Sequence, residues 1–218
     1  MIKSFGNAIA IKLYTGVTHI VGVASENIRV ALDLCHAILE RWLANAPDHK
    51  APIDPLLQSD AICDASNVYL RKLRGQSSPR VVNLVDRLGR LFEVIHKGPR
   101  QGKPEINHFV IKDEPGVELI KLLSQCRAEG ILRWLPGNKR KSRPDARLDA
   151  WQLHPRYAPA FNISWRRKKR LELVAHDLRI LAEGNESDWI TLEKRIEEQY
   201  YKIGPARQDE NEQQGTLL

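Results

Sequence analysis

The chain has 218 residues, 42% hydrophobic and 28% charged, with a formal net charge of +7. This length and apolar content suit one or two small globular domains. Because the sequence has no apolar run of about eighteen residues and residues 1–6 lack the apolar region of a secretory signal, we expect a cytoplasmic protein.

Three cysteines, Cys35, Cys63 and Cys126, lie far apart within apolar helical patterns. Their odd number and wide spacing argue against disulfides, and the absence of paired Cys or His spacings argues against zinc. We therefore expect buried, reduced thiols and no metal site.

The N-terminal residues 1–45 predict a small unit of three helices. Two short helices within residues 7–24 would break at Thr15-Gly16, and a longer helix would follow over residues 25–44, with Ser25 as its N-cap. An apolar stripe with helical spacing predicts the buried face of that longer helix. It consists of Ile28, Leu32, Cys35, Ile38 and Trp42. The polar, proline-containing residues 45–54 predict a linker.

Arg29 occupies the first turn of that longer helix. A cation is unfavourable there because the N-terminal end of the helix dipole is already positive. The position suits an arginine that meets an incoming anion. The alternative is a solvated arginine on the flank of the helix.

Residues 54–164 predict a winged helix-turn-helix domain. Two apolar strand segments, 131–135 and 148–153, flank a polar basic loop, which indicates a β-hairpin. Three helices and a short strand precede the hairpin. They span residues 55–75, 78–98, 106–111 (the strand) and 115–130. Gly130 can act as the C-terminal cap of the last of these helices.

Residues 165–204 predict a C-terminal helical extension, and the polar residues 205–218 predict a flexible tail. A charged helix would follow the cluster at Trp165, and a second helix would span residues 188–203. The second helix has an apolar stripe of Trp189, Leu192, Ile196 and Tyr200. This stripe would pack either on the protein's own core or on a partner, including a second copy.

The positive charge is concentrated in two segments. They contain Arg133, Lys139, Arg140, Lys141, Arg143 and Arg147, and Arg166, Arg167, Lys168, Lys169 and Arg170. A localised basic surface indicates a polyanionic partner, most often nucleic acid. The tip of a winged-helix hairpin would contact phosphates or the minor groove. A solvated turn is the alternative for the tip.

The second basic segment has several interpretations. It could bind phosphate, present Trp165 for base stacking, act as a helix-capping run of cations, or form a solvated face. The helix over residues 115–130 precedes the hairpin and so occupies the position of a recognition helix. It would expose Lys121, Gln125 and Arg127, side chains that can read base edges. Nearby Glu118 and Glu129 repel phosphates, so we expect weak direct readout.

Residues 24–35 resemble the third lid helix of AAA+ ATPases of the origin-recognition and initiator clade (ORC-like). The matching runs are Asn27-Ile28-Arg29, Ala31-Leu32-Asp33 and Leu34-Cys35, while Glu26 stands where that family has glycine. The winged-helix pattern that follows is also similar to that clade. The resemblance implies the C-terminal lid and winged-helix portion of such an ATPase, without the P-loop core. It makes Arg29 a sensor-2-like contact to nucleotide phosphates, provided that a missing N-terminal core or another subunit supplies the nucleotide. Bacterial members of the group occur in defence and mobile-element loci, which extends the implied roles to antiviral defence.

The sequence itself does not predict an enzyme. Residues 98–104 come nearest to a Walker A loop, but only three residues separate the glycines and Pro104 occupies the position of the magnesium-binding hydroxyl. No apolar strand ends in the acids of a Walker B motif. The histidines are scattered, and no nucleophile elbow accompanies them. We therefore expect no ATPase activity and no bound cofactor.

These observations favour a mainly α protein with a small helical lid-like unit, a winged helix-turn-helix domain with a basic β-hairpin, and C-terminal helices. The predicted function is binding of duplex DNA, mainly through its phosphates, as part of or partner to an ORC-like AAA+ ATPase. The alternative is a protein-interaction or oligomerisation module that makes no contact with nucleic acid. RNA binding would use the same basic surface.

Overall fold

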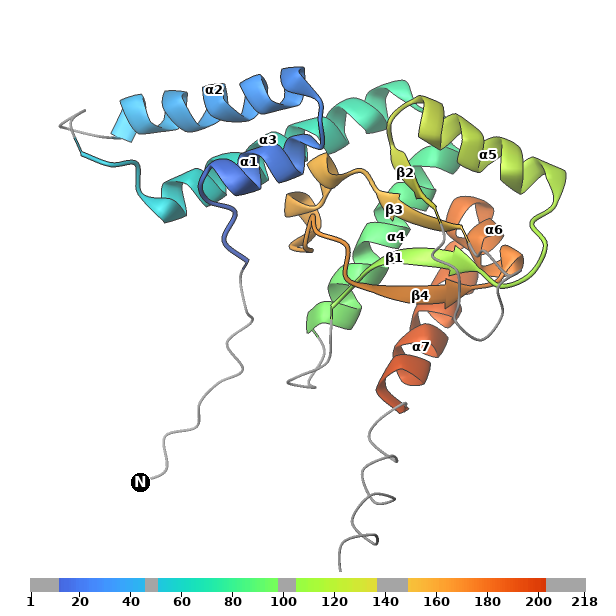
Figure 1. Cartoon of the computed structure of the whole chain (residues 1–218). Helices are drawn as coiled ribbons and strands as arrows, with labels where there is room; N and C mark the ends of the chain where they lie inside the picture. Colours follow the sequence, from blue (N-terminus) through green and yellow to red (C-terminus); the bar gives the residue numbers. More distant parts are fainter. Residues whose placement is uncertain (1–11, 46–50, 98–104, 137–148, 203–218) are drawn as a thin grey trace, which may run out of the picture.

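The computed structural model describes residues 12–45, 51–97, 105–136 and 149–202. This part of the chain forms a helical unit and a larger unit in which helices pack on a four-stranded sheet, joined by the long helix α3 (Figure 1). The predicted class is confirmed: the protein is mainly α, with a helical lid-like unit followed by a winged-helix-like domain. The two units have separate hydrophobic cores.

The lid-like unit consists of α1 (Val17–Ala24), α2 (Ile28–Asn45) and the first half of α3 (Pro55–Gln76). Its core contains Tyr14, Val23, Ala24, Val30, Leu34, Ile38, Ala61 and Ile62. Residues 12–15 are not helical, so the prediction of a helix ending at Thr15 is wrong for this segment. The unit takes its third helix from beyond the predicted linker instead. The rest of that predicted first helix lies outside the described residues.

The connection between α1 and α2 differs from the predicted one. Ser25 ends α1 with a φ of 49°, and Glu26 follows with a φ of 67°. Asn27 is the N-cap of α2: its side-chain oxygen accepts from the backbone amides of Arg29 (3.1 Å) and Val30 (3.3 Å). The prediction of Ser25 as this cap is therefore wrong. Glu26 occupies the left-handed region that glycine adopts without strain.

The buried face of α2 is also different from the predicted stripe. Val30, Leu34 and Ile38 pack in the core of the lid-like unit. Ile28, Leu32 and Cys35 are exposed, so the predicted stripe is wrong except at Ile38 and the half-buried Trp42. Both sides of α2 carry apolar residues at helical spacing, and the contacts with α1 and α3 select one of them.

The larger unit contains a four-stranded sheet with the order β2-β3-β1-β4. β1 (Ile106–Ile111) and the β2–β3 hairpin (Leu132–Leu135 and Ala150–Leu153) agree with the sequence. The strand β4 (Lys169–Leu173) differs from the sequence prediction, which places a charged helix after Trp165. It pairs parallel to β1, while β3 pairs antiparallel to the other edge of β1. The predicted C-terminal extension therefore adds a strand to the sheet.

Helices cover one face of this sheet (Figure 1). They are α4 (Pro79–Lys97), α5 (Val117–Ala128), α6 (Ala175–Glu183) and α7 (Glu186–Lys202). In the sequence, a single helix, α5, lies between β1 and the hairpin. The helix α6 follows β4 in the sequence and packs beside α4. Two short 3₁₀ helices, Pro155–Tyr157 and Pro159–Phe161, connect the hairpin to the rest of the domain.

The apolar stripe of α7 packs on the protein's own core. Trp189, Leu192 and Ile196 are each at most 3% exposed. Of the two interpretations of this stripe, internal packing is therefore confirmed, and it is not a surface for partners. Cys126 is buried, as expected, whereas Cys63 is only half-buried and Cys35 is exposed.

Buried polar contacts fix the two units to each other. The Tyr14 hydroxyl donates to the carbonyl of Ile163 (2.7 Å). The Ser66 hydroxyl of α3 donates to the carbonyl of Arg156 (2.7 Å) and accepts from the amide of Ala160 (3.1 Å). A buried carbonyl or amide without such a partner costs about 1–3 kcal/mol, so these bonds favour one relative placement of the units.

No helix within the described residues is long and apolar enough to cross a membrane. The same part of the chain holds no group of three or more His, Cys, Asp or Glu side chains that could bind a metal ion.

Candidate nucleic-acid interface

A polar row crosses the whole sheet on the face opposite the helices. Arg133 on β2 is paired with Gln152 on β3, Gln152 with His108 on β1, and His108 with Arg170 on β4. Adjacent strands are about 4.8 Å apart, so the row spans about 14 Å. Side chains alternate between the faces of a strand, and the neighbouring residue Phe109 packs in the core on the other face.

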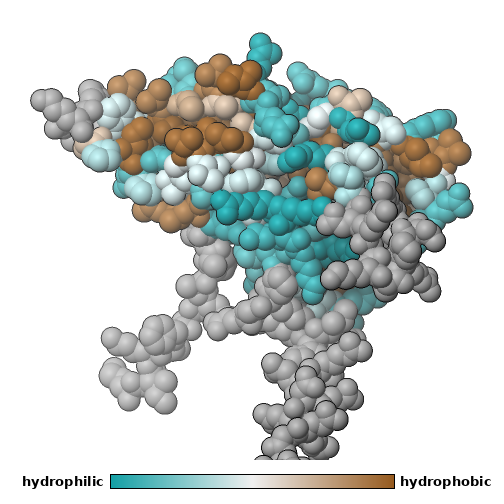
Figure 2. All heavy atoms as spheres, viewed as in Figure 1, coloured by the Kyte–Doolittle hydropathy of each residue, from teal (hydrophilic) through white to brown (hydrophobic). Residues whose placement is uncertain are grey.

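The row brings together cations from both basic segments. Arg133 comes from the first segment and Arg170 from the second, and they lie at opposite ends of the row. The loop before β4 runs over the middle of the row: the Gln152 amide nitrogen donates to the Trp165 carbonyl (3.4 Å), and Arg167 Nε contacts His108 Nε2 (3.4 Å). Figure 2 shows hydrophilic side chains across this face, over β1 and β4. The two segments, although far apart in sequence, therefore place arginines on one face of the sheet, where His108 and Gln152 are buried and Glu172 pairs with Arg170 (3.0 Å).

His108 is a neutral member of this row. Burial, together with the positive charges of Arg167 and Arg170, lowers the pKa of His108 to about 4. At neutral pH its Nε2 can therefore accept from the Arg167 guanidinium. The positive charge of the row comes from its arginines, and His108 helps to orient one of them.

The predicted recognition helix, α5, exposes Lys121, Gln125 and Arg127 as expected. Each already has a partner within the protein. Lys121 pairs with Glu118 (2.8 Å), Gln125 donates to Glu129 (2.8 Å), and the Arg127 guanidinium lies 5.1 Å from the centre of the Trp134 ring. These contacts are exposed to solvent, so replacing them by other contacts costs little free energy.

The β2–β3 ladder brings together the two ends of the basic hairpin loop. Gly130 ends α5 with a φ of 65°, and the amide of Ile131 then donates to the carbonyl of Cys126 (2.7 Å). Arg133 is half-buried on β2. The other predicted site residues of this segment, Lys139, Arg140, Lys141, Arg143 and Arg147, lie outside the described residues.

Two of the interpretations of the second basic segment, helix capping and base stacking by Trp165, are wrong. It does not cap a helix, because Lys169 and Arg170 belong to β4. The Trp165 ring is also not a free stacking surface: it packs against both hydrophobic cores, contacts Gly22 of α1 and meets the His19 ring edge-on. Arg166, Arg167, Lys168 and Lys169 are exposed. Arg166 lies over the Trp165 ring at 4.9 Å.

Arg29 lines a cleft of about 500 Å³ between the two units. Lys72 of α3 and Arg156 of the first 3₁₀ helix also line it, as do the acidic Asp33 and Glu129. The Arg156 guanidinium donates to the Gly130 carbonyl (2.9 Å). Whether Arg29 contacts nucleotide phosphates stays a prediction, since it depends on a nucleotide-bearing core that is supplied elsewhere.

Sequence analysis missed Gln152 and His108. Neither stands in a basic run, and each belongs to the row only because β1 pairs with both β3 and β4. Gln152 also pairs with Arg133 inside the predicted hairpin, so only the link from His108 to Arg170 required a prediction of β4.

The fold is that of a helical lid-like unit joined to a winged-helix-like domain, and the arginines described above lie on the sheet of this domain. A family model described as ORC-CDC6-like matches residues 3–173. The chain belongs to this ORC-CDC6-like family, which confirms the origin-recognition relationship expected from residues 24–35. No curated protein and no solved structure matches the chain.

Two buried histidines predict how stability depends on pH. Burial lowers the pKa of His154 to about 3, and that of His108 to about 4. His154 Nδ1 also accepts from the amide of Arg156 (3.3 Å), which requires the neutral ring. An unfolded histidine takes up its proton near pH 6.5, so the unfolded state binds more protons below that pH. We expect the free energy of unfolding to fall as the pH drops from about 6.5 to about 4.

Urea unfolding across this pH range checks the prediction. His154→Asn keeps a hydrogen-bond acceptor without a titrating ring and should reduce the pH dependence. The exposed His176 is the matched control, since His176→Gln should leave the dependence as it is. Equal dependence in His154→Asn and the unchanged protein would contradict this role for His154.

Proposed function

We propose that the chain binds duplex DNA through its winged-helix-like domain, mainly by contacts to phosphates, as part of or partner to an ORC-like AAA+ ATPase. The observation that carries this proposal is the convergence of Arg133, Arg167 and Arg170 on one sheet face beside the base of the basic hairpin. Family membership supports the association with an ORC-like ATPase. We further propose that the chain contributes binding rather than nucleotide hydrolysis.

Phosphate contacts fit this surface better than base readout. The arginines stand on a sheet and a short loop, not on a helix that could enter the major groove, and the exposed carboxylates Glu118 and Glu129 beside the polar residues of α5 repel phosphates. Cations that contact phosphates release condensed counterions, so the affinity should fall steeply with salt.

The direct test is fluorescence anisotropy of a labelled mixed-sequence duplex over a salt series, beside single-stranded DNA and duplex RNA. We expect binding in the micromolar range at low salt, as is usual for contacts without sequence readout, and preference for duplex DNA. Tighter binding to duplex RNA would assign the basic face to RNA. Absence of binding at low salt would reject the proposal and favour an interaction module.

The hairpin loop should contribute to the same interface. Replacing Lys139, Arg140 and Lys141 by alanine should weaken duplex binding about tenfold and lower the salt slope by up to about 2.7, or 0.9 for each lost phosphate contact. The same salt series measures both. An unchanged affinity and slope would remove the loop from the interface.

A protein-interaction role is the second candidate. The observation that favours it is an apolar surface on α2, where Ile28, Leu32, Leu39 and Leu43 are exposed. Exposed apolar residues that gather on one helix indicate an interaction site, whereas singly scattered ones need no explanation. The two roles are compatible, since α2 and the sheet belong to different units.

A further inference from the structure

The exposed side of α2 has the sequence of a helix that pairs with another helix. Ile28, Leu32, Cys35, Leu39 and Trp42 follow one another at intervals of four, three, four and three residues. This is the heptad spacing of a coiled-coil seam. In the structure Ile28 is 73% exposed, Leu32 62% and Leu39 47%. The opposite side of α2, with Val30, Leu34 and Ile38, is already packed in the core of the lid-like unit.

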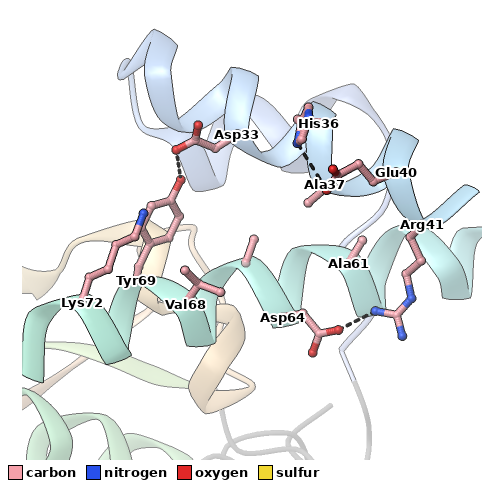
Figure 3. A pocket seen from close by; sticks show the side chains of 11 residues that line it. Asp33, His36, Ala37, Glu40, Arg41, Ala61, Asp64, Val68, Tyr69 and Lys72 are labelled. Carbon is pink, nitrogen blue, oxygen red and sulfur yellow. Dashed lines mark hydrogen bonds and ion pairs between the residues drawn. The ribbon is translucent and has the colours of Figure 1, made fainter.

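A row of charged side chains runs beside this seam. Arg29, Asp33, His36 and Glu40 follow one another at helical spacing on a single flank of α2. Three of them, Asp33, His36 and Glu40, stand at the edge of the groove between α2 and α3 (Figure 3). The row begins with the basic Arg29 and ends with the acidic Glu40, so reversing the helix brings each of these two side chains opposite the other.

The groove itself is partly occupied by contacts between α2 and α3. The Tyr69 hydroxyl donates to Asp33 (2.8 Å), and Arg41 pairs with Asp64 (2.5 Å), so side chains bridge the two helices at two points along it (Figure 3). Alanines, Ala37 and Ala61 among them, line it between these bridges. These contacts hold the acidic and basic flank in place, while Ile28, Leu32 and Leu39 of the apolar seam are exposed.

We propose that α2 is the two-fold interface of a homodimer, in which it packs antiparallel against α2 of a second copy. In this arrangement Arg29 faces Glu40 of the other copy, Asp33 faces His36, and symmetry repeats each pair. A parallel pair would place the charged flank against the opposite flank of its partner, where Ala31 lies, and would lose this complementarity. The charge pattern is thus what identifies a second copy as the occupant. The inference is independent of DNA binding.

The position of Cys35 provides a test of the geometry. The pairing of Arg29 with Glu40 and of Asp33 with His36 places the two-fold axis between residues 34 and 35. The exposed Cys35 thiols of the two copies therefore lie close together. A short bismaleimide should give a covalent dimer, and Cys35→Ser should abolish it. Cys126 is buried, and burial raises the pKa of the half-buried Cys63 to about 11, so neither should substitute for Cys35.

Light scattering across about a hundredfold range of concentration tests the interface itself. We expect a mass that rises toward twice the chain mass of 24.9 kDa. Leu32→Glu combined with Leu39→Glu should give the monomer mass at all concentrations while thermal unfolding of the monomer stays unchanged. Val117→Glu is the matched control, because Val117 is 67% exposed on α5, in the other unit.

Charge reversal distinguishes the antiparallel register from other dimers. Arg29→Glu and Glu40→Arg should each weaken the dimer several-fold, and the two together should restore it. A monomer mass for the unchanged chain at every concentration would overturn the proposal. So would a dimer that survives Leu32→Glu with Leu39→Glu, or a monomer that uses this face to bind an ATPase subunit.

Discussion

A variant with Arg133, Arg167 and Arg170 all replaced by alanine is expected to bind duplex DNA about tenfold to a hundredfold more weakly than the unchanged chain. The three arginines share one face of the sheet, so one duplex could contact them together. Losing up to three phosphate contacts should lower the salt slope by up to about 2.7. Combining this variant with alanine at Lys139, Arg140 and Lys141 should bring the affinity close to zero.

The control for this variant removes the same charge from elsewhere on the surface. Arg71, Arg179 and Lys194 are exposed on α3, α6 and α7. Replacing them by alanine should change the affinity only slightly, because distant charges act through a screened field. If both triple variants lost affinity equally, the net charge would be responsible and the sheet face would have no special role. Thermal unfolding should be similar for the two variants.

The basic face shows what sequence reasoning could and could not reach. The two clusters of cations and the hairpin were evident, since charge runs and short-range strand patterns are local. β4 was not evident, because Lys169 to Leu173 contains three charged residues and its pairing with β1 joins segments more than fifty residues apart. Parallel strands are not joined by a tight turn, so no local turn sequence predicts their pairing. The single basic face depends on that strand.

Sequence reasoning could not predict which face of α2 is buried, for a different reason. Val30, Leu34 and Ile38 form one apolar stripe, and Ile28, Leu32 and Leu39 form another. Helical periodicity detects both stripes but does not rank them. Packing against α1 and α3 decides which stripe is internal, and the homodimer proposed above would bury the other. The stripe predicted as core would then be an interface.

Two glycines at close helix contacts should have the largest effects on stability. Gly89 of α4 packs against the Phe161 ring, and a Cβ at this position would overlap the ring. Gly22 of α1 packs in the same way against the Trp165 ring, which links the two cores. Gly89→Ala and Gly22→Ala should each destabilise the protein by about 1–3 kcal/mol, because an overpacked core must displace the aromatic side chain. Thermal unfolding should show midpoints lower by about 3–10 °C.

Gly75 provides a control, because the same substitution there should raise the stability instead of lowering it. It lies in the last turns of α3, and a Cβ there would meet no other atom within 4 Å. Gly75→Ala should therefore stabilise the protein by about 0.4–1 kcal/mol, since alanine loses less backbone entropy in a helix. Destabilisation by all three substitutions would show that the contacts with Phe161 and Trp165 are not the cause. If Gly22→Ala lowers stability as much as Gly89→Ala, the junction at Trp165 is part of the cooperative fold, and the lid-like unit and the sheet unfold together.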